Sequence, residues 1–460
     1  MHIQNRKNIP GDARKIALTV LNALESGRKT LDAVLENTHH KYPLMLKRDR
    51  SLLYAIVYGV LRWRKRIDWI IDHFSKTPLD KIDPRVLNTL RIGLFQFIYL
   101  NRIPVSAAVD TTVEMAKSFA EPWVVRYVNA LLRNAARGYK NVPYPSVEKD
   151  PEAALSIGKS FPKWLIKKWI GHFGLAETEA LCDAINTIPP ITIRTNTLKT
   201  TRKKLAHALE INAQRVEPTT YSSEGISFCN PEVPVSEIKS FKEGWFQVQD
   251  EAAQLISHFL NPQPGETILD ACAGLGGKTG HIAQMMKNHG RIVAMDKNTE
   301  KLMRLESEMR RLGIKTVTTA PYNLNNTMNG KPLGMFDRIL LDAPCSGLGV
   351  LRRNPDTKWS MSKNKLRYQS ERQIKFLDIL SPLVKPSGIL VYAVCSTEPE
   401  ENDAVVNVFL NKHPLFVIIN NPMEISNKVR SLVNAKGYLR TFPHVHNMDG
   451  FFSVCFKRIK

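Results

Sequence analysis

The chain has 460 residues, of which 43% are hydrophobic and 23% are charged. This composition predicts a globular protein of roughly two to four domains, and it excludes a disordered chain, a fibrous repeat and a disulfide scaffold. Sixty-five Lys and Arg face 43 Asp and Glu, for a net charge of +22, with +12 on residues 1–140 and +10 on the rest. A positive field of this size favours a polyanion, and nucleic acid is the first candidate partner.

Six cysteines lie far apart, without a CxxC pair or a Cys/His cluster at metal-ligand spacing. We therefore expect free thiols in a reducing compartment and no metal. Residues 1–7 carry no apolar signal core, and no apolar run approaches the roughly 20 residues of a membrane span. These features predict a cytoplasmic protein without a membrane partner.

Residues 12–137 carry apolar positions at helical spacing in successive segments, which predicts a compact helical bundle. Asp83 followed by Pro84 is typical of a helix start. Residues 141–160 hold Pro143, Pro145 and Pro151 among polar residues, and we expect a linker there. Residues 161–260 mix short helices and strands, which indicates a small α+β region.

From about residue 266 the pattern alternates between strands and helices. Strands are expected at 267–273, 291–295, 336–341 and 389–394, and helices from 278 and at 299–312, 366–383 and 400–410. Such alternation predicts an α/β fold with a doubly wound parallel sheet and helices on both faces. Ligands of these sheets bind at the carboxyl ends of the strands.

A glycine turn at 274–277 follows the first of these strands and lets the backbone approach a ligand closely. Asp296, at the end of the second strand, can accept both hydroxyls of a ribose. Lys278 follows Gly277 directly, so the dinucleotide pattern G-x-G-x-x-G is absent, and the turn is too short for a phosphate loop. A ligand with a ribose and no phosphate, such as S-adenosylmethionine, fits better than a dinucleotide or a purely structural turn.

Two cysteines follow strands at the same edge of the sheet. Cys345 lies in D-A-P-C-S-G beside Asp342, and Cys395 lies in Y-A-V-C-S. A thiolate at neutral pH needs a pKa below the free value of about 8.5, and a cation such as Lys278 or the sulfonium of the cofactor can supply this. Most cysteines are small buried hydrophobes, and we expect this of Cys182, Cys229, Cys272 and Cys455.

Three motifs together resemble those of the RNA cytosine-C5 methyltransferases: D-A-C-A-G-L-G-G-K-T at 270–279, D-A-P-C-S-G at 342–347 and Y-A-V-C-S-T-E-P-E-E-N at 392–402. The helical part resembles a NusB-type RNA-binding domain, through L-L-Y-A-I-V-Y-G-V-L-R-W-R at 52–64 and V-N-A-L-L-R-N at 128–134. The combination is similar to the bacterial 16S ribosomal RNA methyltransferase B family, of the Sun or Fmu type, as far as D-G-F-F at 449–452.

The resemblance implies methyl transfer from S-adenosylmethionine to C5 of a cytosine in 16S ribosomal RNA, with cytosine 967 as the family target. It implies a NusB-like RNA-binding bundle over 1–140, a linker over 141–160, an α+β RNA-binding region over 161–260 and a Rossmann-like class I methyltransferase domain over 261–460. The partner is then 16S ribosomal RNA, free or in an early small-subunit particle. Nothing in the sequence demands more than a monomer, and we expect one.

The resemblance also implies roles for single residues. Cys395 is the nucleophile, and Cys345 helps to release the product. Asp342 lies at the junction of cofactor and base, and Lys278 positions it. The cofactor site is implied to comprise Cys272, Ala273, Gly274, Leu275, Gly276, Gly277, Lys278, Asp296, Asn323 and Asp342. The base that removes the C5 proton stays open between Cys345 and water.

The chain departs from the family pattern at three places. Leu275 stands where the family often has Pro, and Val394 where it often has Thr. The family's aspartate near the adenine is missing from residues 318–323. Asn323 is the best replacement, because an amide oxygen can still accept from the adenine amine.

Two alternative functions stay open. One keeps the chemistry and changes the substrate to transfer RNA or another ribosomal site; the other is a non-catalytic RNA-binding factor, which would need neither the cysteine pair nor Asp296. Short basic runs suit phosphate contacts as a group, although each alone is more often a solvated helix face. These runs are at 62–66, 202–204, 310–311 and 352–353.

Overall fold

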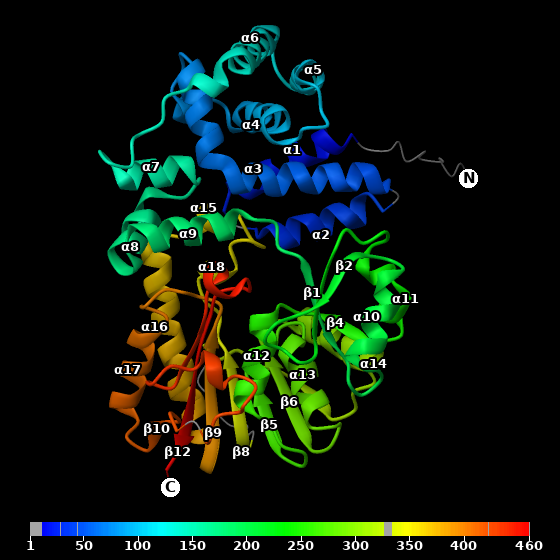
Figure 1. The fold of residues 1–460 in the computed structure, drawn as a ribbon, viewed down its shortest axis with the longest axis vertical. Coiled ribbons are helices and arrows are strands. Elements are labelled where there is room, and N and C mark those ends of the chain that lie inside the picture. Colours follow the sequence, from blue (N-terminus) through cyan, green and yellow to red (C-terminus); the bar gives the residue numbers. More distant parts are fainter. Residues whose placement is uncertain (1–11, 28, 44, 326–333, 422, 460) are drawn as a thin grey trace, which may run out of the picture. The chain divides into compact units, whose positions relative to one another are not determined.

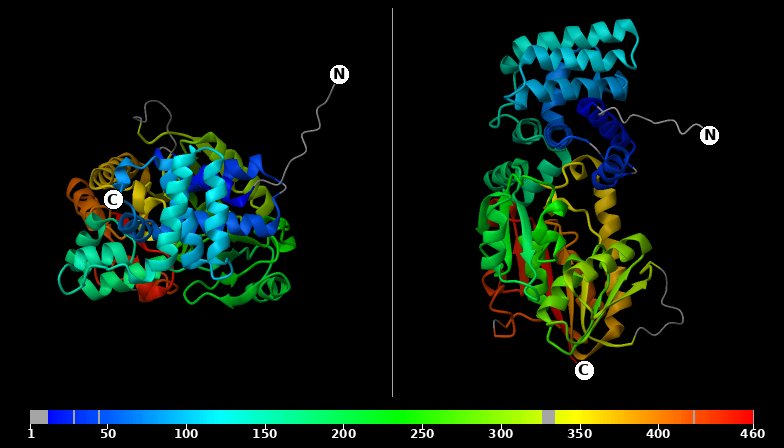
Figure 2. Two further views of the ribbon diagram at one scale, coloured as in Figure 1. Left: turned by 90° about the horizontal axis from the view of Figure 1, so that it is seen from above. Right: turned by 90° about the vertical axis from the view of Figure 1, so that its right-hand side faces the viewer.

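The computed structural model describes residues 12–27, 29–43, 45–325, 334–421 and 423–459 (Figures 1 and 2). The chain forms two compact units, and neither is one continuous stretch. The helical unit comprises residues 1–186 and 354–360, and the sheet unit comprises residues 187–353 and 361–460. Residues 1–11, which include the segment without a signal core, lie outside the described part. Among the described residues no helix combines the length and apolarity that a membrane crossing requires.

The helical unit confirms the all-helical prediction for residues 12–137. Asp83 caps its fourth helix by accepting from the Arg85 backbone N–H at 2.8 Å, and Pro84 occupies the first turn. Helices α5 and α6 lie side by side (Figures 1 and 2). The helices are α1 (Ala13–Glu25), α2 (Leu31–Lys41), α3 (Lys47–Phe74), α4 (Pro84–Tyr99), α5 (Val105–Lys117), α6 (Pro122–Gly138), α7 (Pro151–Gly158), α8 (Lys163–Phe173) and α9 (Leu175–Asn186).

Helix α7 lies inside the segment expected to be a linker. The Asp150 side chain accepts from the Ala153 backbone N–H at 2.9 Å, and Pro151 occupies the first turn. These are the positions at which a cap and a proline favour a helix start. The polar residues and the proline of this segment therefore mark a helix N-terminus as well as the irregular chain before it.

Residues 354–360 pack within the helical unit although the sequence on both sides belongs to the sheet unit. They include the short helix α15 (Thr357–Ser360). Trp359 Nε1 donates to the Leu61 carbonyl at 2.7 Å. The Lys358 ammonium is fully buried, and burial lowers its pKa well below the ordinary value. Lys358 Nζ donates to Asn186 Oδ1 at 2.8 Å and to the carbonyls of Arg62 and Ser160 at 3.4 Å.

The sheet unit begins with a small antiparallel sheet of strand order β2-β3-β1-β4. Together with two helices it forms the strand-containing part of the predicted α+β region, whose first helices belong to the helical unit instead. The elements are β1 (Ile191–Thr195), α10 (Arg202–Glu210), β2 (Gln214–Pro218), β3 (Gly225–Cys229), α11 (Lys239–Lys242) and β4 (Phe246–Val248).

The second sheet has the strand order β10-β12-β9-β8-β5-β6-β7, with β11 paired to β12. Strands β9, β8, β5, β6 and β7 are parallel, which confirms the doubly wound sheet, while β10, β11 and β12 are antiparallel to their neighbours. The strands are β5 (Thr267–Asp270), β6 (Arg291–Asp296), β7 (Val317–Pro321), β8 (Phe336–Asp342), β9 (Val384–Val394), β10 (Phe416–Ile418), β11 (Tyr438–Thr441) and β12 (Phe451–Arg458).

Alternate residues of the central strands enter two separate hydrophobic clusters, as expected for a sheet that is buried on both faces. Ile268 and Leu340 pack against α12, α13 and α14, whereas Leu269 and Leu341 pack against α16 and α17 (Figure 1). These helices are α12 (Glu251–Leu260), α13 (Gly277–Met285), α14 (Thr299–Leu312), α16 (Lys363–Leu380) and α17 (Asp403–Lys412). The chain also contains the short helix α18 (Pro443–His446) and the 3-10 turns η1 (Leu79–Lys81), η2 (Tyr139–Asn141), η3 (Val235–Glu237), η4 (Leu348–Val350), η5 (Ser381–Leu383) and η6 (Arg430–Leu432).

The expected extent of the first strand was wrong. Strand β5 ends at Asp270, so Cys272 lies in the turn that follows and not inside the strand. At the end of the strand the Asp270 side chain accepts from Thr279 Oγ1 at 2.7 Å, which joins the strand end to α13. The antiparallel strands β10 to β12 were not predicted either, since residues 416–458 contain no helix–strand alternation.

Candidate active site

A cavity of about 380 Å³ opens at the carboxyl ends of the parallel strands. It lies where the strand order reverses between β5 and β8, the place at which open α/β sheets bind ligands. Seven sequence-predicted residues line it: Cys272, Gly274, Asp296, Asn323, Asp342, Cys345 and Cys395. The sequence analysis missed Tyr322, Arg372 and Phe376, which also line the cavity but belong to no recognisable motif.

The other residues predicted for the cofactor site do not border this cavity among the described residues: Ala273, Leu275, Gly276, Gly277 and Lys278. The glycines of the turn therefore have different roles. A Cβ atom on Gly274 would project into open space, whereas one on Gly276 would come within 2.6 Å of the Leu305 side chain. Gly276 is thus required for packing against α14.

The carboxylate of Asp296 is held by two backbone groups at the mouth of the glycine turn. The Gly274 N–H donates to Asp296 Oδ2 at 3.0 Å, and the Asn298 N–H donates to Oδ1 at 2.8 Å. Asn323 reaches the same cavity, although its Oδ1 already accepts from the Asn325 N–H at 3.0 Å. An amide oxygen carries a second lone pair and can accept once more.

An ion pair crosses from helix α13 to the end of strand β8. Lys278 Nζ lies 2.6 Å from Asp342 Oδ2. Burial lowers the pKa of Lys278, but the charge of Asp342 and the hydrogen bond to it more than compensate, so the pKa lies above its ordinary value. Cys395 is close enough to contribute to this effect. Lys278 is therefore a fixed cation beside the cysteine.

The two strand-end cysteines meet in the cavity, with their Sγ atoms 3.2 Å apart. The hydrogen bond to Cys395, followed by burial, raises the pKa of Cys345 well above that of a free thiol. Cys345 therefore keeps its proton at neutral pH. Burial also raises the pKa of Cys272, which lines the cavity as a neutral thiol.

A buried network behind the cysteines fixes the loop after β8, and the sequence analysis assigned it no role. Glu401 accepts from the Ser346 backbone N–H at 2.8 Å and from its hydroxyl, and Gln373 Nε2 donates to Glu401 at 3.0 Å. The Tyr392 hydroxyl donates to Gln373 Oε1 at 2.9 Å. Burial raises the pKa of Glu401. Its partners lie in the loop after β8 and on α16, far from Glu401 in the sequence. The only sequence signal for this role is that Glu401 belongs to the third motif.

The backbone of Cys395 is clamped by two glycines. The Gly349 N–H donates to the Cys395 carbonyl at 3.0 Å, and the Gly450 N–H donates to the Gly349 carbonyl at 2.8 Å. A Cβ atom on Gly349 would lie 1.9 Å from the Gly450 oxygen, so only glycine fits. The closing D-G-F-F motif thereby contributes to the position of Cys395.

Three family models match the chain. Residues 257–457 match the 16S rRNA methyltransferase RsmB/F model, residues 11–137 match the NusB family, and residues 161–236 match the ferredoxin-like domain of RsmF/B-like methyltransferases. The chain is 34% identical over 453 residues to a probable ribosomal RNA small subunit methyltransferase B of Synechocystis sp., covering 97% of this chain and 99% of the relative. A protein of the same name from Bacillus subtilis is 34% identical over 449 residues, covering 97% and 98%.

The chain belongs to the ribosomal RNA small subunit methyltransferase B family. As a member it is an rRNA methyltransferase with a NusB-like helical region, which confirms the resemblance found in the sequence. The crystal structure of PH0851 has the same fold, with a TM-score of 0.80 and 27% identity, over 98% of this chain and 99% of that chain.

Several basic residues of this methyltransferase that were expected to contact phosphate are used internally. Arg352 and Arg353 bind the two Asp449 oxygens at 2.7 and 2.9 Å, and Arg353 also binds Asp250 at 2.7 Å. Arg311 pairs with Glu308. Others among the expected residues are exposed and can contact phosphate: Lys65, Lys203, Lys204 and Arg310.

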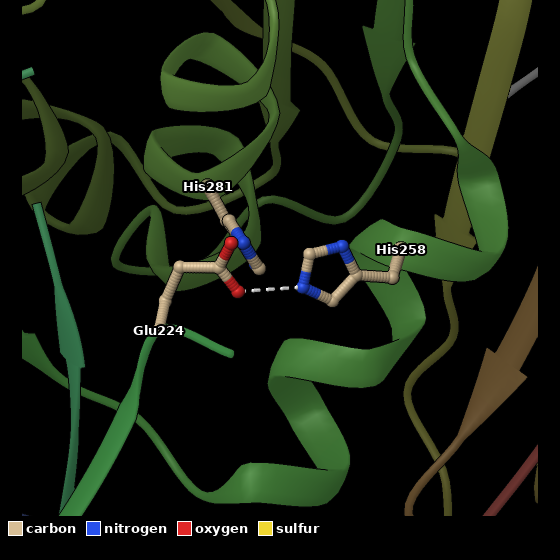
Figure 3. A group of neighbouring side chains, drawn as sticks. All are labelled: Glu224, His258 and His281. Carbon is tan, nitrogen blue, oxygen red and sulfur yellow. Dashed lines mark hydrogen bonds and ion pairs between the residues drawn. The ribbon is translucent and has the colours of Figure 1, made fainter. Parts of the chain in front are cut away.

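Away from the cavity, three side chains of metal-ligand type meet in the sheet unit: Glu224, His258 and His281 (Figure 3). His258 Nε2 and Glu224 Oε2 form a hydrogen bond of 2.9 Å, and Lys428 Nζ binds Glu224 Oε1 at 2.8 Å. Burial, followed by the positive charge of Arg194, lowers the pKa of His281 well below its ordinary value. Two cations beside the cluster oppose a dication, so we interpret the cluster as part of a buried polar contact. The absence of a metal stays a prediction.

Proposed function

We propose that this methyltransferase transfers a methyl group from S-adenosylmethionine to C5 of a cytosine in 16S ribosomal RNA, through a covalent bond between Cys395 and C6 of the base. The observation that carries the proposal is the pair of sulfur atoms 3.2 Å apart in one cavity. Lys278 and Asp342 lie beside them. A methyltransferase that acted on an already nucleophilic atom would need no thiol at this edge of the sheet.

The cavity fits the cofactor. Its volume of about 380 Å³ and the open space in front of Gly274 leave room for a nucleoside. The fixed Asp296 carboxylate offers acceptors for ribose hydroxyls, and the Asn323 side chain is placed for the adenine amine. When bound, S-adenosylmethionine supplies a methyl group on a positively charged sulfur.

Cys395 is the nucleophile in this proposal. C5 of cytosine is a poor nucleophile, and covalent catalysis divides the difficult step into easier ones. The Cys395 thiolate would form a bond to C6, which makes C5 enamine-like, and C5 would then bond to the methyl carbon while the methyl–sulfur bond breaks and S-adenosylhomocysteine leaves. Cys345 keeps its proton and can donate a hydrogen bond to the Cys395 sulfur, while the Lys278 cation favours the thiolate.

Asp342 and a base complete the reaction. Asp342 faces the cavity, and in its protonated form it would donate to N3 of the ring as charge develops there. A base removes the C5 proton, the electrons of that C–H bond form the C5–C6 double bond again, and the C6–sulfur bond breaks to release the Cys395 thiolate. Water and Cys345 are the two candidates for this base, and Cys345 could act only after giving up the proton that it holds in the resting site.

The RNA surface is proposed to include the NusB-like residues up to 140 and the region 161–260. The target base has to leave its stack to reach the cavity, so an unpaired nucleotide is the cheapest substrate. Exposed lysines such as Lys203 and Lys204 provide phosphate contacts, and RNA affinity should therefore fall steeply with salt. Cytosine 967 and a monomeric enzyme remain the expected target and state, and the substrate stays open between free 16S RNA and an early small-subunit particle.

A denaturing gel tests the covalent step. Cys345→Ala, Cys395→Ala and the matched control Cys455→Ala, a buried cysteine away from the cavity, are incubated with S-adenosylmethionine and either deproteinised 16S RNA or immature small subunits. We expect a protein–RNA adduct to accumulate with Cys345→Ala, to be absent with Cys395→Ala, and to stay at the wild-type level with Cys455→Ala. The reverse pattern would make Cys345 the nucleophile, and no adduct with either substrate would contradict covalent catalysis.

A further inference from the structure

A seam of buried polar side chains joins the small antiparallel sheet to helix α13, which begins in the glycine turn. At its centre is Arg194 on strand β1, which is only 1% exposed. Its guanidinium donates to the Gly277 carbonyl at 2.8 Å, to Gln247 Oε1 at 2.8 Å, to Gln284 Oε1 at 3.4 Å and to Gln249 Oε1. All four acceptors are uncharged oxygens.

Such an arrangement is costly for a residue with only a packing role. A guanidinium buried among neutral acceptors loses its hydration without the return that a carboxylate would give, and burial lowers the pKa of Arg194 to about 9. A methionine of similar volume would avoid the desolvation of the charge, but it would leave the four acceptor oxygens without this donor. The retained charge therefore points to a function.

Helix α13 is shaped to receive this guanidinium. A Cβ atom on Gly280, in the helix interior, would come within 3.1 Å of Gln247 Oε1 and 3.3 Å of Arg194 Nη2. Glycine in a helix interior destabilises the helix, but here the missing side chain lets the helix lie directly against the arginine. Gln247 is the cross-strand neighbour of Arg194, so both groups reach α13 from the small sheet.

The bond to Gly277 lies one residue from the proposed chemistry. Gly277 is the first residue of α13, and its carbonyl shares one planar peptide unit with the N–H of Lys278. The Lys278 side chain projects from the helix at this point, and its Nζ lies 2.6 Å from Asp342 Oδ2. Fixing the Gly277 carbonyl therefore fixes the direction from which the Lys278 side chain starts.

We infer that Arg194 is a positioning residue for methyl transfer, which holds the Gly277–Lys278 peptide and thereby the glycine turn and the Lys278–Asp342 pair. The inference rests on the proposed function, because it assumes that this turn and this pair serve the cofactor and the base. It gives the small sheet a second role besides RNA binding, as the support of the helix behind the cavity.

The test compares Arg194→Met and Arg194→Lys with the matched control Arg338→Met. Arg338 is another largely buried arginine of the sheet unit; it binds Glu266 at 2.7 Å near the start of β8, at the end opposite Asp342. We expect Arg194→Met to lower kcat/KM for S-adenosylmethionine at least tenfold, Arg194→Lys to recover part of this loss, and Arg338→Met to stay within twofold of wild type. The melting temperatures of the two methionine variants are compared. Equal kinetic effects of Arg194→Met and Arg338→Met would overturn the inference.

A gentler variant covers the case in which Arg194→Met does not fold. Gly280→Ala keeps the arginine but displaces its guanidinium slightly. It should therefore lower kcat/KM by a smaller factor than Arg194→Met. Wild-type kinetics for Gly280→Ala would count against the inference. Calorimetric titration of the wild-type enzyme with S-adenosylhomocysteine separates the two proposals. If the wild-type enzyme does not bind S-adenosylhomocysteine, the cofactor proposal is refuted. If the wild type binds it and the variants match the wild type in binding and turnover, only the role of Arg194 is refuted.

Discussion

The two sides of the cavity are held in different ways. On the side of β5 and β6, backbone N–H groups of the turn hold the Asp296 carboxylate, so local chain geometry sets the site. On the side of β8 and β9, a network of buried side chains, with Glu401, Gln373 and Ser346 as its main members, fixes the loop that carries Cys345. The carboxylate of Asp296 therefore depends on two backbone contacts, whereas a network of distant side chains fails as a unit.

The largest effect is expected at the contact that joins the two sides. Lys278→Met removes the cation that pairs with Asp342 and leaves this carboxylate without its partner. We expect kcat to fall by about two orders of magnitude or more, in line with the loss of an electrostatic group in a catalytic site. Single-turnover methylation assays measure this, and a loss confined to KM would contradict a role in the chemical step.

The next effect should separate the two sides. Glu401→Gln keeps the shape of the side chain, but its NH2 group replaces the carboxylate oxygen to which the Ser346 hydroxyl donates, so this charge-assisted hydrogen bond is lost and the hydroxyl has to turn and accept instead. We expect a loss of about 1–3 kcal/mol in the free energy of unfolding and about a tenfold fall in kcat. Affinity for S-adenosylhomocysteine should be unchanged, and a matching loss of this affinity would show that the two sides are not independent.

A smaller and opposite effect is expected from Asp296→Asn. The amide can still accept from the Gly274 N–H, but it offers a weaker acceptor to the ribose and has to orient one NH2 group toward the Asn298 N–H. We expect about tenfold weaker binding of S-adenosylhomocysteine, or about 1.4 kcal/mol. The adduct yield at saturating cofactor should stay at the wild-type level, which a gel assay checks.

The last prediction concerns Asp270, behind the glycine turn, where we expect an effect on stability and the smallest effect on turnover. Burial raises its pKa from 3.8 to about 7. Because the folded state holds the proton more tightly than the unfolded state, this stabilising effect is complete below about pH 4 and is lost as the pH rises through 7. Asp270→Asn removes this titration, so its melting temperature relative to wild type should rise between pH 4 and pH 8. A constant difference across this range would contradict the raised pKa.

The sequence predicted the residues that line the cavity better than the contacts that hold them in place. The glycine turn, Asp296, Asp342 and the two cysteines stand at predictable strand ends, and parallel strands bring such ends together. Glu401 and Gly349 act through partners that are distant in sequence and that the topology brings close. Position 349 has to be glycine because a Cβ atom there would lie 1.9 Å from the Gly450 oxygen. Single-sequence periodicity cannot show such contacts.

The basic residues teach the same lesson about charge. The net charge of +22 indicated a polyanion, and the family confirms an RNA substrate. The sequence could not show which arginines face solvent, because the partners of Arg352 and Arg353 lie about a hundred residues away or more at Asp449 and Asp250. The adjacent pair was therefore interpreted as a surface run when it is an internal ion-pair network.

The placement of residues 354–360 in the helical unit has a consequence for synthesis on the ribosome. Helices α1 to α9 of that unit are complete by residue 186, but Lys358, which donates to Asn186 and to the backbone oxygens of Arg62 and Ser160, follows only after some 170 further residues have been translated. During synthesis the nascent bundle therefore lacks the contacts of Lys358 while the first strands of the sheet unit are translated. Chain order makes maturation of the RNA-binding half depend on arrival of the methyl-transferring half.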